Sequence, residues 1–312
     1  GKAISIFQGI KEYLDDSNIM FAQGCDIESN DYSGFDKAVN MAKKADKIIM
    51  VLGEDYNMSG EAASRTNIKL PGIQTQLIKT IRDELPNKPI ILVLMNGRPL
   101  DLTIEDSLAD AILEVWYPGT SGGLGVADIL FGKYNPSAKL PITFPRNLGQ
   151  VPIYYNQKNT GRPISKENPT EDYKSNYIDS PNTPLYPFGH GLSYTTFKYS
   201  EIKLSNDKVK ESEILKASST ITNTGDFDGH EIVQLYIRDK VGSITRPVKE
   251  LKGFKKIFLK KGESKTVVFE ISPEDLKFYN NGKLILESGE FEIAISPSSD
   301  FEFNKLFKLI LN

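Results

Sequence analysis

The residues best suited to chemistry lie in the segment Ser59-Gly60-Glu61-Ala62-Ala63-Ser64-Arg65, which carries one carboxylate and one cation. It follows the apolar run of residues 48–52, which predicts a buried strand. Open α/β sheets bind ligands at the carboxyl ends of their parallel strands. Residues 54–70 show neither a helical nor a strand period, and structureless loops longer than about 12–15 residues are usually functional or disordered. Because clear elements flank this loop, we predict that it is functional and presents Glu61 at the sheet edge.

Glu61 has two interpretations. As a general acid/base it would be an ionisable carboxyl on a loop that closes over a substrate, with a pKa raised by partial burial. As a surface residue it would be solvated or paired with Arg65, and residue chemistry alone favours this second interpretation. Arg65 would either bind substrate or hold the loop, and we favour holding the loop. Glu54 and Asp55 are rival candidates for an acid or a ligand of sugar hydroxyls, although we favour a role in capping the strand end.

Other motifs favour structural interpretations. Residues 119–125 (GTSGGLG) resemble a phosphate cradle, but they lack the Gly-Lys-Ser/Thr ending of a P-loop and the spacing of a dinucleotide fingerprint. We therefore expect a tight strand-to-helix turn there. His190 lies between glycines and predicts a packed turn, and His230 opens a strand and is expected to be structural. Asn57-Met58-Ser59 is a glycosylation sequon that overlaps the functional loop, and we interpret it as coincidence.

Composition excludes several classes of protein. The net charge of −3 gives no basic field for nucleic acid and no polybasic patch for a membrane surface. No apolar run approaches the roughly 20 residues that span a bilayer. The single cysteine, Cys25, excludes an internal disulfide and a cysteine-type zinc site within one chain. The two histidines lie far apart in the sequence, so we expect no metal and no cofactor.

The first half of the chain alternates helical and strand patterns, which predicts an α/β domain with a mostly parallel sheet. Apolar stripes of helical period predict helices over residues 6–14, 35–42, 73–85 and 122–131, with Pro71 in the first turn of the third. Short apolar runs predict strands over residues 19–22, 48–52, 89–94 and 111–116. We place this domain at residues 1–146.

The second half changes character. Pro, Asn, Gly and Tyr dominate residues 147–196, which predicts an extended, ordered linker anchored by its aromatic side chains, with a flexible linker as the alternative. Beyond it the apolar period becomes two, as in residues 233–237, 267–271 and 291–295. Turn signals such as Asn280-Asn281-Gly282 separate these runs. Residues 197–312 therefore predict an all-β sandwich of the immunoglobulin or fibronectin type.

Several strings together resemble the C-terminal part of a β-glucosidase of glycoside hydrolase family 3. They are SGEAASR (59–65), IKLPGIQ (68–74), WYPGTSGG (116–123), ADILFG (127–132), PSAKLPITFP (136–145), YPFGHGLSY (186–194) and VQLYI (233–237). The resemblance implies an α/β sandwich domain whose first strand is missing before Lys2, followed by a fibronectin type III-like domain. We accordingly expect a mature, trimmed or excised piece of a longer protein.

The resemblance also implies a function. Enzymes of this family are retaining exo-glycosidases that act on β-linked oligosaccharides and glycosides, with an Asp nucleophile on a preceding (β/α)8 barrel. By the pattern Ser-Gly-Glu-x-x-x-Arg, Glu61 is the general acid/base, and Ser59, Gly60 and Arg65 support its loop. The family resemblance favours a periplasmic or secreted location.

This chain departs widely from the family pattern, because the barrel is absent. It contains no Ser-Asp-Trp nucleophile motif, because its only tryptophan, Trp116, follows Val115. Retaining hydrolysis needs two carboxyl groups about 5–5.5 Å apart, and this chain supplies one of them. We therefore expect the isolated chain to be inactive. The alternative is a non-catalytic carbohydrate-binding or scaffold module of the same fold, and a nucleotide-binding α/β domain is a third, weaker reading of the glycine loop.

Overall fold

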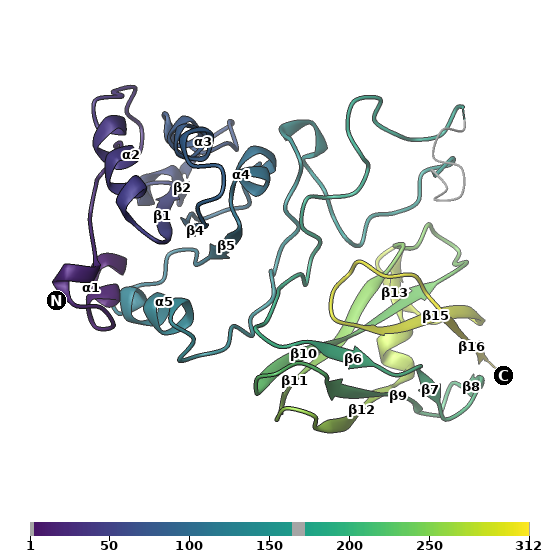
Figure 1. Ribbon diagram of the computed structural model, residues 1–312. Coiled ribbons are helices and arrows are strands. Elements are labelled where there is room, and N and C mark those ends of the chain that lie inside the picture. The colour runs from purple at the N-terminus through teal and green to yellow at the C-terminus, as the bar shows by residue number, and fades with distance from the viewer. Residues whose placement is uncertain (1–2, 164–171, 312) are drawn as a thin grey trace. The chain divides into compact units, whose positions relative to one another are not determined.

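The computed structural model describes residues 3–163 and 172–311, which divide into two compact units (Figure 1). The first unit contains residues 1–134 and 144–151, and the second contains residues 135–143 and 152–312. Two predicted features fall partly outside the described residues: the start of the chain at residues 1–2 and residues 164–171 of the proposed linker. The division into segments 1–146, 147–196 and 197–312 stays a prediction.

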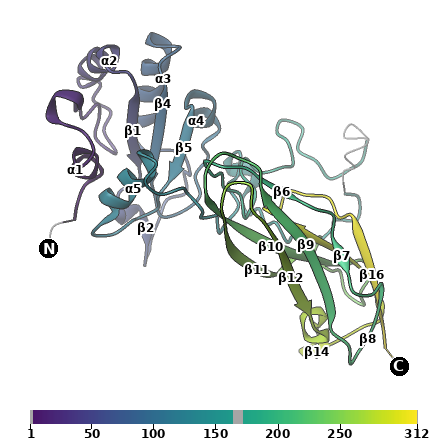
Figure 2. The same cartoon turned by 60° about the horizontal axis from the view of Figure 1, so that its bottom comes forward.

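The first unit is built on a parallel sheet in the order β1-β4-β5 (Figure 2). Its strands are β1 (Ile48–Gly53), β4 (Ile90–Met95) and β5 (Ala111–Glu114). Ile48 pairs with Ile90 in register, and Ile91 pairs with Ala111. The central strand β4 is apolar throughout because helices cover both of its faces, as the continuous run of its sequence predicts. The predicted α/β class is confirmed.

Helices α1 and α5 cover one face of this sheet. The helices of the unit are α1 (Ile6–Lys11), α2 (Phe35–Lys44), α3 (Gln74–Glu84), α4 (Thr103–Leu108) and α5 (Gly122–Leu130). Ile6 and Ile10 of α1 form a cluster with Val126 of α5 and Val93 of β4. Helix α3 contacts α2 on one side and α4 on the other.

A later part of the chain completes the first unit. Residues 144–151 return to it after residues 135–143, and they contain η3 (Leu148–Gln150). The Phe144 side chain is 1% exposed and packs with the Trp116 ring at a centroid distance of 5.9 Å. The Thr103 hydroxyl donates to the Arg146 carbonyl at 2.7 Å. Phe144 of this returning segment therefore belongs to the first unit's core.

Two local expectations are wrong, and one helix was not predicted. Residues 19–22 form no strand; they follow η1 (Asp16–Asn18) as irregular chain, and Phe21 instead packs its ring against Phe7. Four apolar residues without a strand partner cannot satisfy their backbone groups as a strand. Helix α3 begins at Gln74, so Pro71 precedes it and does not occupy its first turn. Helix α4 was not expected, because its six residues are too few to show a helical period.

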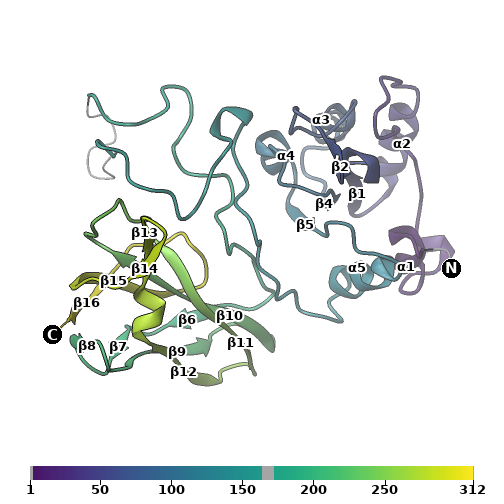
Figure 3. The same cartoon turned by 180° about the vertical axis from the view of Figure 1, so that it is seen from behind.

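The second unit is a β-sandwich (Figure 3). One sheet has the order β11-β10-β15-β16-β8; in the other, β12-β9-β6, strand β7 also pairs with β9. The strands are β6 (Phe197–Tyr199), β7 (Lys203–Leu204), β8 (Lys208–Lys210), β9 (Leu215–Asn223), β10 (Gly229–Asp239), β11 (Glu250–Leu259), β12 (Ser264–Ile271), β15 (Gly289–Ser296) and β16 (Lys305–Ile310). The predicted fibronectin-like sandwich is confirmed.

A short hairpin confirms one turn signal. Strands β13 (Phe278–Asn280) and β14 (Lys283–Ile285) are joined by Asn281 and Gly282, both with positive φ, at 49° and 77°. Two successive residues of positive φ are the signature of the turn that Asn-Gly favours in hairpins. The short helix η4 (Pro273–Leu276) precedes this hairpin.

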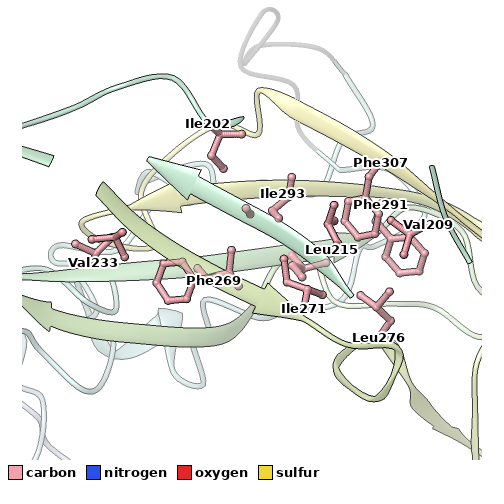
Figure 4. Packing of buried hydrophobic residues seen from close by; sticks show 14 of the residues in the cluster. Ile202, Val209, Leu215, Val233, Phe269, Ile271, Leu276, Phe291, Ile293 and Phe307 are labelled. Carbon is pink, nitrogen blue, oxygen red and sulfur yellow. The ribbon is translucent and has the colours of Figure 1, made fainter. Parts of the chain in front are cut away.

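The sandwich core provides the first testable prediction. Ile293 is fully buried between the sheets, where it lies in a cluster with Val233, Phe269 and Phe291 (Figure 4). Replacing Ile293 by alanine should lower the free energy of unfolding by about 2–5 kcal/mol, because it removes buried carbon and leaves a cavity. Urea denaturation measures this loss. Ile178 is 100% exposed, so Ile178→Ala is the control and should change stability by no more than about 0.5 kcal/mol. Equal losses in the two variants would contradict the assigned core.

Candidate active site

The exit from β1 is fixed by a glycine and a glutamine. Gly53 has φ +152°, and a Cβ built there would lie 1.9 Å from the Met95 carbonyl oxygen, so only glycine fits. The Gly53 N–H donates to Gln74 Oε1 at 2.8 Å, and Gln74 Nε2 donates to the Gly53 carbonyl at 2.8 Å. The side chain of Gln74 thus binds both polar groups of one backbone residue. It sets the point at which the chain leaves the sheet toward Glu54.

Glu61 lies at the tip of a small hairpin. After η2 (Tyr56–Met58), strand β2 (Ser59–Gly60) pairs antiparallel with β3 (Ala63–Ser64), so Glu61 and Ala62 form the turn. Ala62 has φ +56°, as a two-residue turn of this kind requires. The expectation of a loop without regular structure is therefore wrong at these residues. Ser59 and Gly60 form the first strand of this hairpin, and their support of Glu61 stays a prediction.

The Glu61 carboxylate is solvent-exposed in this chain. Arg65 does not pair with it; the guanidinium of Arg65 binds Glu54 instead. The surface ion pair between Glu61 and Arg65 is thus not formed, and these residues do not supply the partial burial that an acid/base role requires. The hairpin is a short, hydrogen-bonded support that carries the exposed carboxylate in its turn.

Glu54, Arg65 and Arg98 form an ionic clamp at the base of the hairpin. Glu54 is buried, and its Oε1 accepts from Arg65 Nη1 at 2.8 Å and from Arg98 Nη2 at 3.0 Å. Arg98 also donates to the carbonyls of Arg65 and Asn67, the second at 2.8 Å, and Arg65 donates to the carbonyl of Lys69 at 3.2 Å. The clamp therefore joins the start of the loop to its end. Arg65 contacts Glu54 and the Lys69 carbonyl, and its role in holding the loop stays a prediction.

Tyr117 and Gly97 add a second contact with the hairpin. The Tyr117 hydroxyl donates to the Asp55 carbonyl at 3.0 Å, and burial raises the pKa of this phenol, so it remains a donor at neutral pH. A Cβ built on Gly97 would lie 2.8 Å from the Ser59 side chain and from the Tyr117 ring. Glycine is required there because three segments approach one another closely. The ends of β1, β4 and β5 thus all contribute to holding the segment that presents Glu61.

The comparisons with known proteins identify the family of this chain. The model of the glycosyl hydrolase family 3 C-terminal domain matches residues 2–194, and that of the fibronectin type III-like domain matches residues 231–299. This chain belongs to glycoside hydrolase family 3. The resemblance stated from the sequence is confirmed, and it extends to the C-terminal part of β-glucosidases of this family.

Individual relatives of this family 3 chain are similar over nearly its whole length. The periplasmic beta-glucosidase of Salmonella typhimurium is 45% identical over 320 residues, covering 96% of this chain and 41% of that protein. A beta-xylosidase of Formosa agariphila is 40% identical, covering 95% of this chain and 40% of that protein. The crystal structure of a beta-glucosidase from Listeria innocua in complex with isofagomine has a TM-score of 0.92 and 37% identity, covering 99% of this chain and 42% of that one. The chain therefore spans about two fifths of these relatives.

The other candidate functional residues of this family 3 chain pack against neighbouring parts of the fold. Gly123 of the glycine loop lies against α1, since a Cβ built on it would be 2.1 Å from the Ser5 carbonyl. In the second unit, His190 stacks on Tyr186 at 5.3 Å, and His230 lies 5.0 Å from the Phe258 ring. Burial lowers the pKa of His230. Among the described residues, no group of three or more His, Cys, Asp or Glu side chains could hold a metal ion.

Sequence reasoning missed two residues of the site. Arg98 and Tyr117 both follow predicted strands, β4 and β5, within a few residues. The carboxyl ends of parallel strands lie along one edge of a sheet, so polar side chains just beyond them are candidates for a shared site. That signal was present for both residues. Glu54 was assigned to the strand end, but its double ion pair was not expected.

Proposed function

We propose that this chain is the C-terminal portion of a retaining β-glucosidase-type exo-glycosidase and supplies Glu61 as the general acid/base. The observation that carries the proposal is the position of Glu61, at the tip of a hairpin whose base is fixed by the ionic clamp. A catalytic carboxyl has to be held in a fixed position toward its substrate. In this proposal the Asp nucleophile lies on a (β/α)8 barrel outside this chain.

The proposed reaction has two steps. Protonated Glu61 gives its proton to the glycosidic oxygen while the barrel Asp attacks the anomeric carbon, which breaks the glycosidic bond and forms a glycosyl-enzyme. Ionised Glu61 then takes a proton from water as that water attacks the same carbon and releases the sugar. Since Glu61 is exposed here, the barrel and the bound sugar would have to provide the burial that keeps it protonated before the first step.

The proposed substrates are β-linked glucosides or related glycosides and oligosaccharides, because the relatives named above are beta-glucosidases and a beta-xylosidase. A periplasmic or secreted location is proposed from the periplasmic relative. Among the described residues, none of the helices has the length and apolar character needed to cross a membrane.

The isolated chain tests whether the nucleophile lies outside it. We expect the 312-residue chain to show no turnover of an aryl β-glucoside, because it provides only one of the two required carboxyl groups. A longer protein in which this chain follows the barrel should hydrolyse the same substrate. Turnover by the chain alone that Glu61→Gln abolishes would contradict the proposed barrel nucleophile. An inactive longer protein that still binds sugar would support the non-catalytic module instead.

A further inference from the structure

Glu114, the last residue of β5, is a carboxyl group with two unusual partners. Its Oε1 accepts from the backbone N–H of Trp116 at 2.9 Å, and its Oε2 accepts from Asn96 Nδ2 at 3.2 Å. Asn96 is fully buried, and its Nδ2 also donates to the Arg98 carbonyl at 2.8 Å. Within the described residues, Asn96 Oδ1 is buried and has no hydrogen-bond partner. A buried acceptor without a donor is uncommon and calls for an explanation.

The partners of Glu114 lie next to the hairpin that carries Glu61. Trp116 has φ +52°, a left-handed conformation that costs a bulky residue roughly 1–3 kcal/mol and therefore needs support. The bond from its N–H to Glu114 supplies that support. The next residue, Tyr117, donates to the Asp55 carbonyl, and Arg98 belongs to the ionic clamp. Glu114 is thus connected through hydrogen bonds to both structures that hold the hairpin.

We propose that Glu114 and Asn96 form a proton-operated switch that positions the base of the Glu61 hairpin. With Glu114 ionised, the Asn96 amide bridges Glu114 and the Arg98 carbonyl, as in the structure. When Oε2 takes a proton from solvent, it becomes a donor, and the Asn96 amide rotates so that Oδ1 accepts that proton. The rotation pairs Oδ1 with the carboxyl O–H, and it withdraws the amide N–H groups from both Glu114 and the Arg98 carbonyl. Glu114 is a positioning residue here, and its effect on catalysis rests on the proposed function.

The surroundings of Glu114 place this switch near neutral pH. Burial raises the pKa of Glu114 to about 7, against the opposing effects of the Trp116 N–H and the Asn96 amide. Among the charged residues connected to this network, Arg98 is ion-paired with Glu54, and the backbone carbonyl of Asp55 accepts from Tyr117. Because the folded-state pKa is raised, the protonated form contributes stability that is present at low pH and lost as pH rises through about 7.

The single tryptophan makes the switch observable without an activity assay. In the 312-residue chain, Trp116 fluorescence should change between pH 5 and pH 9 with a midpoint near the Glu114 pKa of about 7. Glu114→Gln offers an oxygen to the Trp116 N–H and a donor to Asn96 Oδ1, so it imitates the protonated state. Its fluorescence should stay at the low-pH value throughout. A wild-type signal without a transition, or the same transition in Glu114→Gln, would overturn the proposal.

Two further variants keep the test decisive. Glu105 is also buried with a pKa raised by burial, but it bonds Thr75, so Glu105→Gln should retain the wild-type transition. Asn96→Ala removes a bond that lowers the pKa of Glu114, so its midpoint should move to higher pH. An unchanged midpoint in Asn96→Ala would contradict the pairing even where Glu114→Gln fails to fold.

The catalytic consequence is measured separately in the longer protein. The ratio of wild-type to Glu114→Gln kcat should be close to one at pH 5 and rise several-fold at pH 8, because only wild type ionises there. Equal ratios at both pH values would overturn the link between the switch and catalysis. The fluorescence transition does not depend on whether Glu61 is the acid/base. The Glu61 variants therefore test the acid/base role separately from the switch.

Discussion

Replacing Glu61 by alanine in the longer protein will lower kcat for a β-glucoside about 10²–10⁴-fold, the range that a positioned acid/base contributes. The loss should be largest for substrates with a poor leaving group, because these depend most on protonation of the glycosidic oxygen. Aryl glycosides with acidic phenols should lose less in the first step. This dependence on the leaving group separates loss of an acid/base from general damage to the site.

Azide provides a second readout for the same variant. A small anion that needs no proton removal can attack the glycosyl-enzyme in place of water, so azide should restore turnover to Glu61→Ala and give a glycosyl azide. Glu12 is an exposed carboxylate on the same unit, outside the hairpin, and Glu12→Ala should keep full activity. Full activity in Glu61→Ala, or a loss that neither the leaving group nor azide changes, would refute the assigned role.

Removing the Glu54 side chain should have a large effect on the stability of the first unit. Glu54→Ala leaves two partly buried guanidinium groups without their shared carboxylate, and breaking a buried ion pair from one side costs about 3–5 kcal/mol. Urea denaturation followed by Trp116 fluorescence reports this unit, because the chain has no other tryptophan. The same variant should lower kcat in the longer protein, since the hairpin loses its base.

The matched control is an exposed pair. Glu84 binds Lys43 at 3.0 Å, with side chains 52% and 48% exposed, so Glu84→Ala should cost at most about 1 kcal/mol. Replacing Glu54 and both arginines together by apolar residues of similar volume should recover much of the lost stability, but not the activity. If Glu54→Ala and Glu84→Ala are equally stable, the ionic clamp does not hold the loop.

The sequence predicted those parts of the structure that depend on interactions between residues close together in the chain. Strand β4 is a continuous apolar run because helices cover both faces of the sheet, so its burial was visible in the residues. The turn at Asn281-Gly282 was equally visible, because only certain residues tolerate its backbone angles. The strand predicted at residues 19–22 was wrong because an apolar run indicates burial but does not show that a strand partner exists.

The site was less predictable than the fold. The motif around Glu61 drew attention to the right loop, yet β2 and β3 have two residues each, too few for any period to show. The ionic clamp joins Glu54 to Arg98, 44 positions away, and Tyr117 reaches Asp55 across 62 positions. Such pairings depend on how strands are ordered in the sheet. A single sequence gives the candidates at each strand end, but not their partners.

The return of residues 144–151 to the first unit has a consequence for how the protein is made. A ribosome that has released only residues 1–134 has released a sheet and helices whose Trp116 ring still lacks Phe144. The unit can close only after residues 135–143, which belong to the second unit, have also emerged. Nascent chains stalled before residue 144 should therefore be more sensitive to protease than chains stalled beyond residue 151, and synthesis of the two units is interleaved rather than sequential.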